Sequence, residues 1–156
     1  MSDAQLGHEK TLTGLIAALA GANLIYGLGM LESGITFDFA QLVLDSEFAR
    51  MIKQTVNGFI IDDESLAVEV IKSVGPSKDF LAQEHTLKHM RDHSRPELID
   101  RSGIEMWRAS GATDSYQRAL EKTREILETH QPEPLPEKVQ AEIHSIITET
   151  EGELGV

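Results

Sequence analysis

The stretch TLTGLIAALAGANLIYGLGMLESG, residues 11–34, decides the fold of this chain. Its first part predicts a helix over residues 8–20, because leucine and isoleucine recur at helical spacing and alanines fill the other faces. The run NLIYGL, residues 23–28, predicts a short strand that is apolar on both faces, as in a parallel sheet covered by helices. The glycines after this run predict a loop in which the backbone lies close to another group.

That single strand indicates an α/β fold whose other strands lie outside the chain. A lone strand cannot complete a sheet by itself, so its partners must come from a second copy or from a longer parent protein. An eight-stranded β/α barrel requires about 250 residues, and the chain has 156. The chain is therefore too short to hold a complete barrel of this kind.

The rest of the sequence is predicted to be mainly helical. The clearest helix covers residues 37–58, where apolar residues from Ala40 to Val56 form one stripe, with Thr36 or Asp38 as the cap and Gly58 as the end. Three prolines after residue 130 predict a stiff hinge before the last helix. The further predicted helices cover residues 63–74, 81–91, 104–109, 116–130 and 136–149.

Composition excludes several functions. The net charge is −12 and the basic residues are scattered among acidic ones, which argues against binding to nucleic acid or to an anionic membrane. The absence of cysteine excludes disulfides and thiolate sites and suits a cytoplasmic location. The uncharged run Thr11–Leu31 is long enough to span a bilayer, but its glycines and Asn23 dilute its hydrophobicity, so we expect no membrane segment.

A pair of histidines four residues apart, His85 and His89, is the one candidate metal site. Such a pair can share a helix face and bind a metal. The sequence EHTLKH, however, lacks the glutamate between the two histidines that a zinc protease requires. We therefore expect structural or solvated histidines and no bound metal.

Several segments together resemble the C-terminal part of the trimethylamine methyltransferase family, whose members are corrinoid-dependent. The similarity begins in DAQLGHEKTL (residues 3–12) and GANLIYGLGMLESG (21–34) and continues over nearly the whole chain. The later segments, in the family's order, are DDESLAVEVIKSVGP (62–76), FLAQEHTLKHMR (80–91), LIDRSGIEMW (98–107) and THQPEPLPEKVQ (129–140).

The resemblance implies a TIM-type β/α barrel that moves a methyl group from a methylated or quaternary amine, such as trimethylamine or glycine betaine, to a corrinoid protein. This activity belongs to one-carbon metabolism and methanogenesis. Residues 1–58 would supply the closing β/α segment and residues 59–156 a helical C-terminal extension. The cobalamin-type cofactor would be presented by the partner protein rather than bound directly. The chain would be a natural short product, a truncation or the portion downstream of an in-frame amber codon, and we expect it to be inactive alone.

The resemblance also places Tyr26, Gly27, Gly29 and Glu32 at the barrel mouth as substrate-binding residues, since barrel chemistry occurs at the C-terminal ends of strands. Tyr26 would face the methyl groups of a cation, or else pack in the core. Glu32 would attract that cation, or else pair with a nearby backbone amide. The sequence singles out no catalytic residue. The alternative function is a non-catalytic helical module that docks an upstream barrel segment or forms homo-oligomers.

Overall fold

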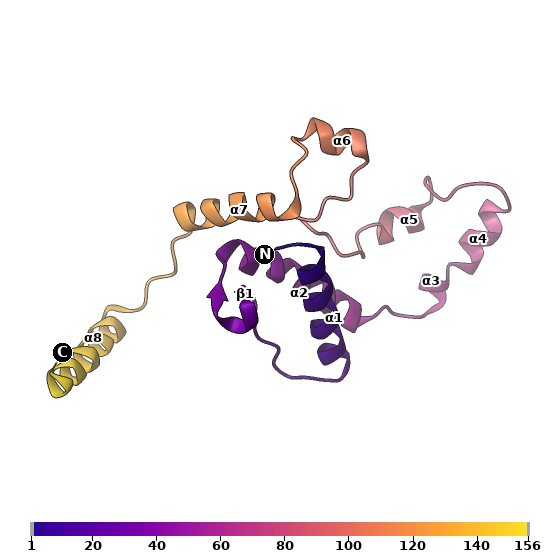
Figure 1. Cartoon of the computed structure of the whole chain (residues 1–156). Helices are drawn as coiled ribbons and strands as arrows, with labels where there is room; N and C mark the ends of the chain where they lie inside the picture. The colour runs from indigo at the N-terminus through magenta and orange to yellow at the C-terminus, as the bar shows by residue number, and fades with distance from the viewer. Residues whose placement is uncertain (1, 156) are drawn as a thin grey trace. The chain divides into compact units, whose positions relative to one another are not determined.

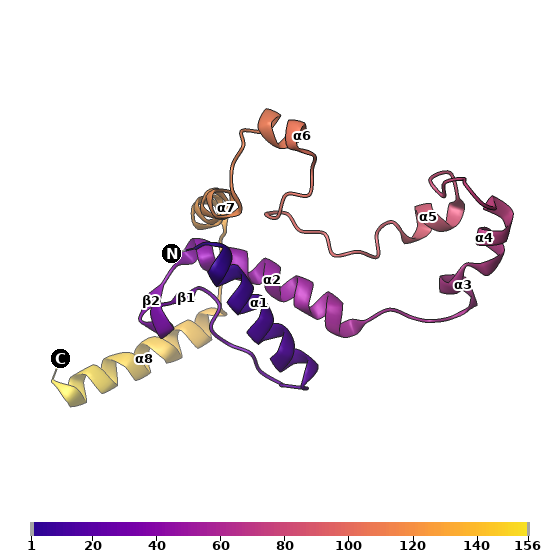
Figure 2. The same ribbon diagram turned by 45° about the vertical axis from the view of Figure 1, so that its right-hand side comes forward.

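A computed structural model describes residues 2–155. The chain divides into two compact units, one ending at Arg124 and the other beginning at Glu125. This division differs from the expected boundary at residue 58, which concerns the parent barrel and stays a prediction. The first unit is built around α1 (Ala4–Leu19) and α2 (Phe39–Asn57), which lie side by side in Figures 1 and 2.

Two glycines of α1 allow the close contact between α1 and α2. Gly7 faces the ring of Phe48, and a Cβ atom at Gly14 would lie 3.0 Å from the Cδ1 atom of Ile52. A larger residue at Gly14 would require the end of the Ile52 side chain to move by a few tenths of an ångström. Asp3 caps α1 by accepting a hydrogen bond from the backbone N–H of Leu6, and the predicted helix over residues 8–20 is confirmed with an earlier start.

The prediction of a strand over residues 23–28 is wrong. Residues 24–27 form an irregular segment, and the short strands β1 (Met30–Leu31) and β2 (Thr36–Phe37) pair with each other, antiparallel, around the 3₁₀ turn η1 (Glu32–Gly34). A strand is stabilised by ladder hydrogen bonds to a neighbour. No other segment of residues 2–155 pairs with residues 23–28. The apolar run does not by itself indicate whether a partner strand exists.

The predicted helix over residues 37–58 is confirmed as α2. The side chain of Asp38 accepts a hydrogen bond from the N–H of Gln41 and caps the helix, and Gly58 ends it. Phe48 is only partly buried, and the residue that faces its ring from α1 is Gly7, which has no side chain. The small core at this helix consists of Ala40, Leu44, Leu98 and Ala119, with Val43, Phe48, Tyr116 and Leu120 packed around it.

A buried glutamate on α2 holds a distant loop. The side chain of Glu47 is 1% exposed and accepts hydrogen bonds from the backbone N–H groups of Glu97, Leu98 and Ile99, at 2.8–3.0 Å. Arg50 also donates to this carboxylate. The loop thereby brings Leu98 into the core, where α7 (Ser115–Thr129) supplies Ala119.

The helix predicted over residues 63–74 is divided in two. Asp62 and Ser65 form a capping box at the start of α3 (Asp63–Leu66), and Ala67 then turns left-handed at φ +50° before α4 (Val68–Val74). The N–H of Ala67 donates to the carbonyl of Glu64 and closes α3 after one turn. The remaining elements are α5 (Glu84–His89), α6 (Ile104–Ala109) and, in the second unit, α8 (Glu137–Leu154).

Many apolar side chains of the described residues are exposed to solvent. On α1, Leu12, Ile16 and Leu19 are exposed, although the sequence predicted a helix buried on most sides. Only α2 packs closely against this helix among the described elements. No helix within residues 2–155 is long and apolar enough to cross a membrane.

Candidate functional site

Asp45 is the centre of a buried polar cluster in the first unit. Its side chain is 5% exposed. One carboxylate oxygen, Oδ2, accepts a hydrogen bond from the backbone N–H of Gly29 at 2.8 Å and pairs with the ammonium group of Lys10. The other, Oδ1, accepts from the side-chain amide of Gln41 at 2.6 Å. One buried carboxylate thus joins α1, α2 and the glycine loop.

The same cluster fixes the backbone on both sides of Gly29. Lys10 also donates to the carbonyl of Gly27 at 3.4 Å, and the N–H of Asp38 donates to the carbonyl of Gly29 at 2.9 Å. Gly29 has φ +75°, and a Cβ atom there would lie 2.9 Å from the ring of Phe37. Only glycine fits this position without strain, so the expected close approach at Gly29 is real. The approaching group is the protein's own β2 strand and α2.

A cavity of about 270 Å³ lies between α1, α2 and this loop. Tyr26 and Gly27 line it, and Lys10 and Asp45 are its charged groups. Those two charges pair with each other, so the remaining wall is mainly apolar. The volume of the cavity lies just below the range of about 300–1,000 Å³ that is common for small-ligand sites. Its apolar lining comes from Ile25, Leu28, Phe48, Ala49 and Ile52.

The structure separates the expected site residues into two groups. Tyr26 and Gly27 line the cavity, whereas Gly29 and Glu32 do not. Tyr26 is 82% exposed, so its alternative role as a packed core aromatic is wrong for this structure. Glu32 lies in the turn at φ +49° and accepts a hydrogen bond from the hydroxyl of Thr36 at 2.6 Å. This contact spans the β1–β2 turn rather than the cavity.

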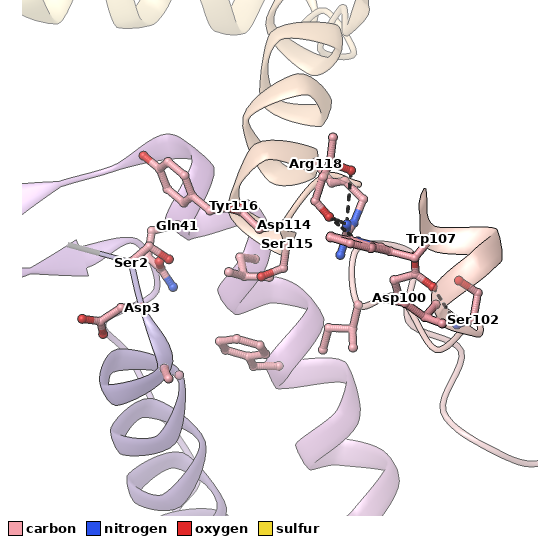
Figure 3. Close-up of a pocket in the computed structure, with 17 residues that line it drawn as sticks. Ser2, Asp3, Gln41, Asp100, Ser102, Trp107, Asp114, Ser115, Tyr116 and Arg118 are labelled. Atoms are coloured by element: carbon pink, nitrogen blue, oxygen red, sulfur yellow. Dashed lines mark hydrogen bonds between the residues drawn. The ribbon is translucent and has the colours of Figure 1, made fainter. Parts of the chain in front are cut away.

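A second, larger cavity of about 880 Å³ lies near the first residues of α2, as Figure 3 shows. Its wall includes Gln41, whose side chain is 0% exposed and whose Oε1 atom has no hydrogen-bond partner among the described residues. Tyr116 lies on the same side and donates a hydrogen bond to Asp38 at 2.6 Å. Trp107 and Arg118 form part of the opposite wall.

The contact between Tyr116 and Asp38 shifts the pKa of both groups. Burial by itself raises the pKa of Asp38, but the hydrogen bonds from Tyr116 and from the N–H groups of Gln41 and Ala40 outweigh burial and lower the pKa below its ordinary value. The same hydrogen bond, together with burial and the negative charge of Asp38, raises the pKa of Tyr116. The ionised carboxylate and the neutral phenol are therefore the stable pair at neutral pH.

The histidine pair forms part of a polar contact between α3 and α5. The Nε2 atom of His85 lies 2.9 Å from the carbonyl oxygen of Glu64, and the Nδ1 atom of His89 lies 2.7 Å from a carboxylate oxygen of Asp92. Lys88 pairs with the carboxylate of Glu64. Within residues 2–155, no three histidine, aspartate or glutamate side chains are arranged to hold a metal ion. The expectation of no bound metal stays a prediction.

Sequence reasoning missed Lys10, Gln41 and Asp45. Lys10 and Asp45 are 35 positions apart, so their pairing was not readable from the sequence. The sequence did contain an indication of Gln41 and Asp45. These polar residues are one turn apart on the face of α2 that carries the buried Leu44. Polar groups on a buried helix face require hydrogen-bond partners.

The helix pair, the carboxylate-bound glycine loop and the small cavity form a mainly helical segment. Comparison with known proteins gives it a family. The family model "Trimethylamine methyltransferase (MTTB)" matches residues 1–155. The chain belongs to the trimethylamine methyltransferase family, as the resemblance predicted.

Its relatives carry two substrate names. Trimethylamine methyltransferase MttB of Desulfitobacterium hafniense (strain DSM 10664 / DCB-2) is 58% identical over 99% of this chain and 31% of its own length. MttB2 of Methanosarcina mazei, also named a trimethylamine methyltransferase, is 44% identical over 93% of this chain and 29% of its own. Glycine betaine methyltransferase of D. hafniense (strain Y51) is 32% identical over 98% of this chain and 32% of its own. The chain spans less than a third of each.

Proposed function

We propose that this chain is the C-terminal portion of an enzyme that transfers a methyl group from a methylated or quaternary amine to a corrinoid protein. The family match over residues 1–155 carries the proposal. The greater identity to the trimethylamine enzyme, 58% against 32%, favours trimethylamine over glycine betaine as the substrate.

The chemistry requires a protein that holds a cation or amine and excludes water. The C–N bond would break with its electron pair going to the departing amine, and the corrinoid of the partner protein, as the second substrate, would supply the electron pair for the new bond to the methyl group. A quaternary ammonium would leave as a neutral amine without proton transfer, whereas trimethylamine would react as its protonated ion, so that dimethylamine leaves as a neutral molecule. Positioning and a favourable environment for the cation are the contributions left to the protein.

The cavity beside the glycine loop supports a part in substrate binding. Tyr26 has an exposed ring at its edge, and aromatic faces attract alkylammonium ions. The apolar wall suits methyl groups, and Gly27 leaves space at the rim. Glu32 lies farther along the same loop and would contribute negative charge without contacting the cavity.

The test is an NMR titration of the 156-residue chain with tetramethylammonium. We expect the Tyr26 ring and the Gly27 amide to shift together and saturably, because both line the cavity. tert-Butanol, an uncharged ligand of similar shape, is the control and should shift them much less. Equal responses to the two ligands, or no saturable response, would contradict a cation site at this loop.

The alternative is a helical module that docks an upstream segment or forms oligomers without contributing to the site. The exposed apolar residues of α1 favour a docking role for this face. The titration separates the two functions, since a docking module has no reason to distinguish a cation from a neutral alcohol.

A further inference from the structure

We infer that Asp45 is the positioning residue of the glycine loop: its negative charge holds residues 27–29 in the conformation that places Tyr26 at the cavity. The link from Asp45 to amine binding rests on the proposed function, whereas the effect of Asp45 on the conformation of the loop can be tested separately. Asp45 does not need to contact the amine in this role. It acts through the backbone of Gly29 and through Lys10.

The carboxylate of Asp45 accepts three hydrogen bonds. Both of its oxygens accept, from a backbone N–H, an ammonium group and a side-chain amide. Hydrogen bonds to a charged acceptor are about twice as strong as neutral ones. A neutral side chain of the same shape would weaken all three contacts at once.

Two attachments connect Asp45 to the loop. Lys10 donates hydrogen bonds both to the carboxylate of Asp45 and to the backbone carbonyl of Gly27. Asp45 accepts a hydrogen bond from the backbone N–H of Gly29, so the loop is held at two points. Tyr26 directly precedes this pair of attachments. Because Gly27 and Gly29 are the residues with the greatest backbone freedom in the segment, they need such external contacts to adopt one conformation.

The side-chain amide of Gln41 donates a hydrogen bond to the same carboxylate. Its amide orientation is fixed, since only the Nε2 group can donate to Asp45. Its buried Oε1 atom is left without a donor among the described residues. An unpartnered buried carbonyl is costly, and its retention indicates that the carboxylate of Asp45 determines the arrangement of this cluster.

Hydrogen exchange on the full chain tests the inference with two matched variants. Asp45→Asn should accelerate exchange of the Gly29 amide by about tenfold to a hundredfold, the range expected for losing a hydrogen bond to a charged group. Glu47→Gln is the control, because Glu47 is also a buried carboxylate of α2 but holds Glu97, Leu98 and Ile99. It should accelerate those three amides and leave Gly29 unchanged.

If both variants accelerate both regions equally, Asp45 contributes only to general stability and the inference is overturned. Should Asp45→Asn fail to fold because Lys10 is left unpaired, the double variant Lys10→Met/Asp45→Asn removes that charge and should still release Gly29. A double variant that keeps Gly29 protected would also overturn the inference.

Titration of the same variants with tetramethylammonium tests whether the conformation of the loop affects binding. The wild-type chain should bind it, and Asp45→Asn should bind several-fold more weakly while Glu47→Gln binds normally. If the wild-type chain does not respond but Asp45→Asn still releases Gly29, the proposed function fails and the positioning role remains. If Asp45→Asn binds as the wild type does, the positioning role fails and the proposed function remains.

Discussion

At the scale of single residues, Gly29 is the glycine at which an added side chain would meet the closest neighbours. A Cβ atom there would lie 2.9 Å from the Phe37 ring, 3.0 Å from the Cβ atom of Leu42 and 3.1 Å from the Asp38 carbonyl. With the left-handed backbone added, Gly29→Ala should lower the free energy of unfolding by about 2–4 kcal/mol. Urea denaturation measures this change.

Gly21 provides the matched control for that substitution. It has φ +84°, but nothing lies within 4 Å of the position a Cβ atom would occupy. Gly21→Ala should therefore cost only the backbone strain, about 1 kcal/mol. Equal costs for the two substitutions would show that the contacts around Gly29 do not limit its size.

The hydrogen bond from Tyr116 to Asp38 predicts a dependence of stability on pH. Asp38 has a lowered pKa, so its contribution is complete above the ordinary value of 3.8 and is lost as pH falls through the folded-state pKa. Tyr116 has a raised pKa, so its contribution is complete below 10.0 and is lost as pH rises through the folded-state value.

The variant Tyr116→Phe tests that pair. It should cost about 1–2 kcal/mol at neutral pH, because the hydrogen bond to a charged acceptor is lost while Asp38 still accepts from the N–H of Gln41. The extra loss of stability in wild type above pH 10.0 and below pH 3.8 should become smaller in the variant. Parallel pH profiles for the two proteins would contradict this account.

At the scale of elements, most helices were predictable, whereas the break at Ala67 and the strands were not. The period of α2 and the cap and end residues Asp38 and Gly58 depend on local sequence, and the structure agrees with them. Strand pairing depends on distant segments, so the apolar run at residues 23–28 could not by itself indicate whether a partner exists. The cavity and the contact of Lys10 with Asp45 also required the three-dimensional arrangement.

Replacing Phe48 tests how much the packing of α1 against α2 contributes to the free energy of unfolding. Its ring packs beside Gly7 and the small core but remains partly exposed. Phe48→Ala should therefore cost about 2–3 kcal/mol, less than the roughly 3–5 kcal/mol typical of a fully buried phenylalanine. Thermal or urea unfolding of the variant gives the value, and a loss below about 1 kcal/mol would mean that the helices pack mainly through other contacts.

At the scale of the whole molecule, the exposed apolar residues predict association of the isolated chain. Leu12, Ile16, Leu19 and Leu24 are all exposed, and apolar surface beyond a few hundred Å² commonly marks an interface. The net charge of −12 opposes loose aggregation and favours a small oligomer. Light scattering at low concentration should give a mass above 17.2 kDa. A monomer of 17.2 kDa with a shielded Leu24 would contradict this prediction.

The central claim is that this chain completes a methyl-transferring enzyme, and reconstitution tests it most directly. The chain is combined with the separately produced upstream portion of the Desulfitobacterium hafniense relative, which is 58% identical over the shared region. Transfer of labelled methyl from trimethylamine to a corrinoid protein is then measured. We predict transfer from the mixture and none from either piece alone, with Asp45→Asn reducing it. A stable complex of the two pieces that transfers no methyl group would contradict the claim.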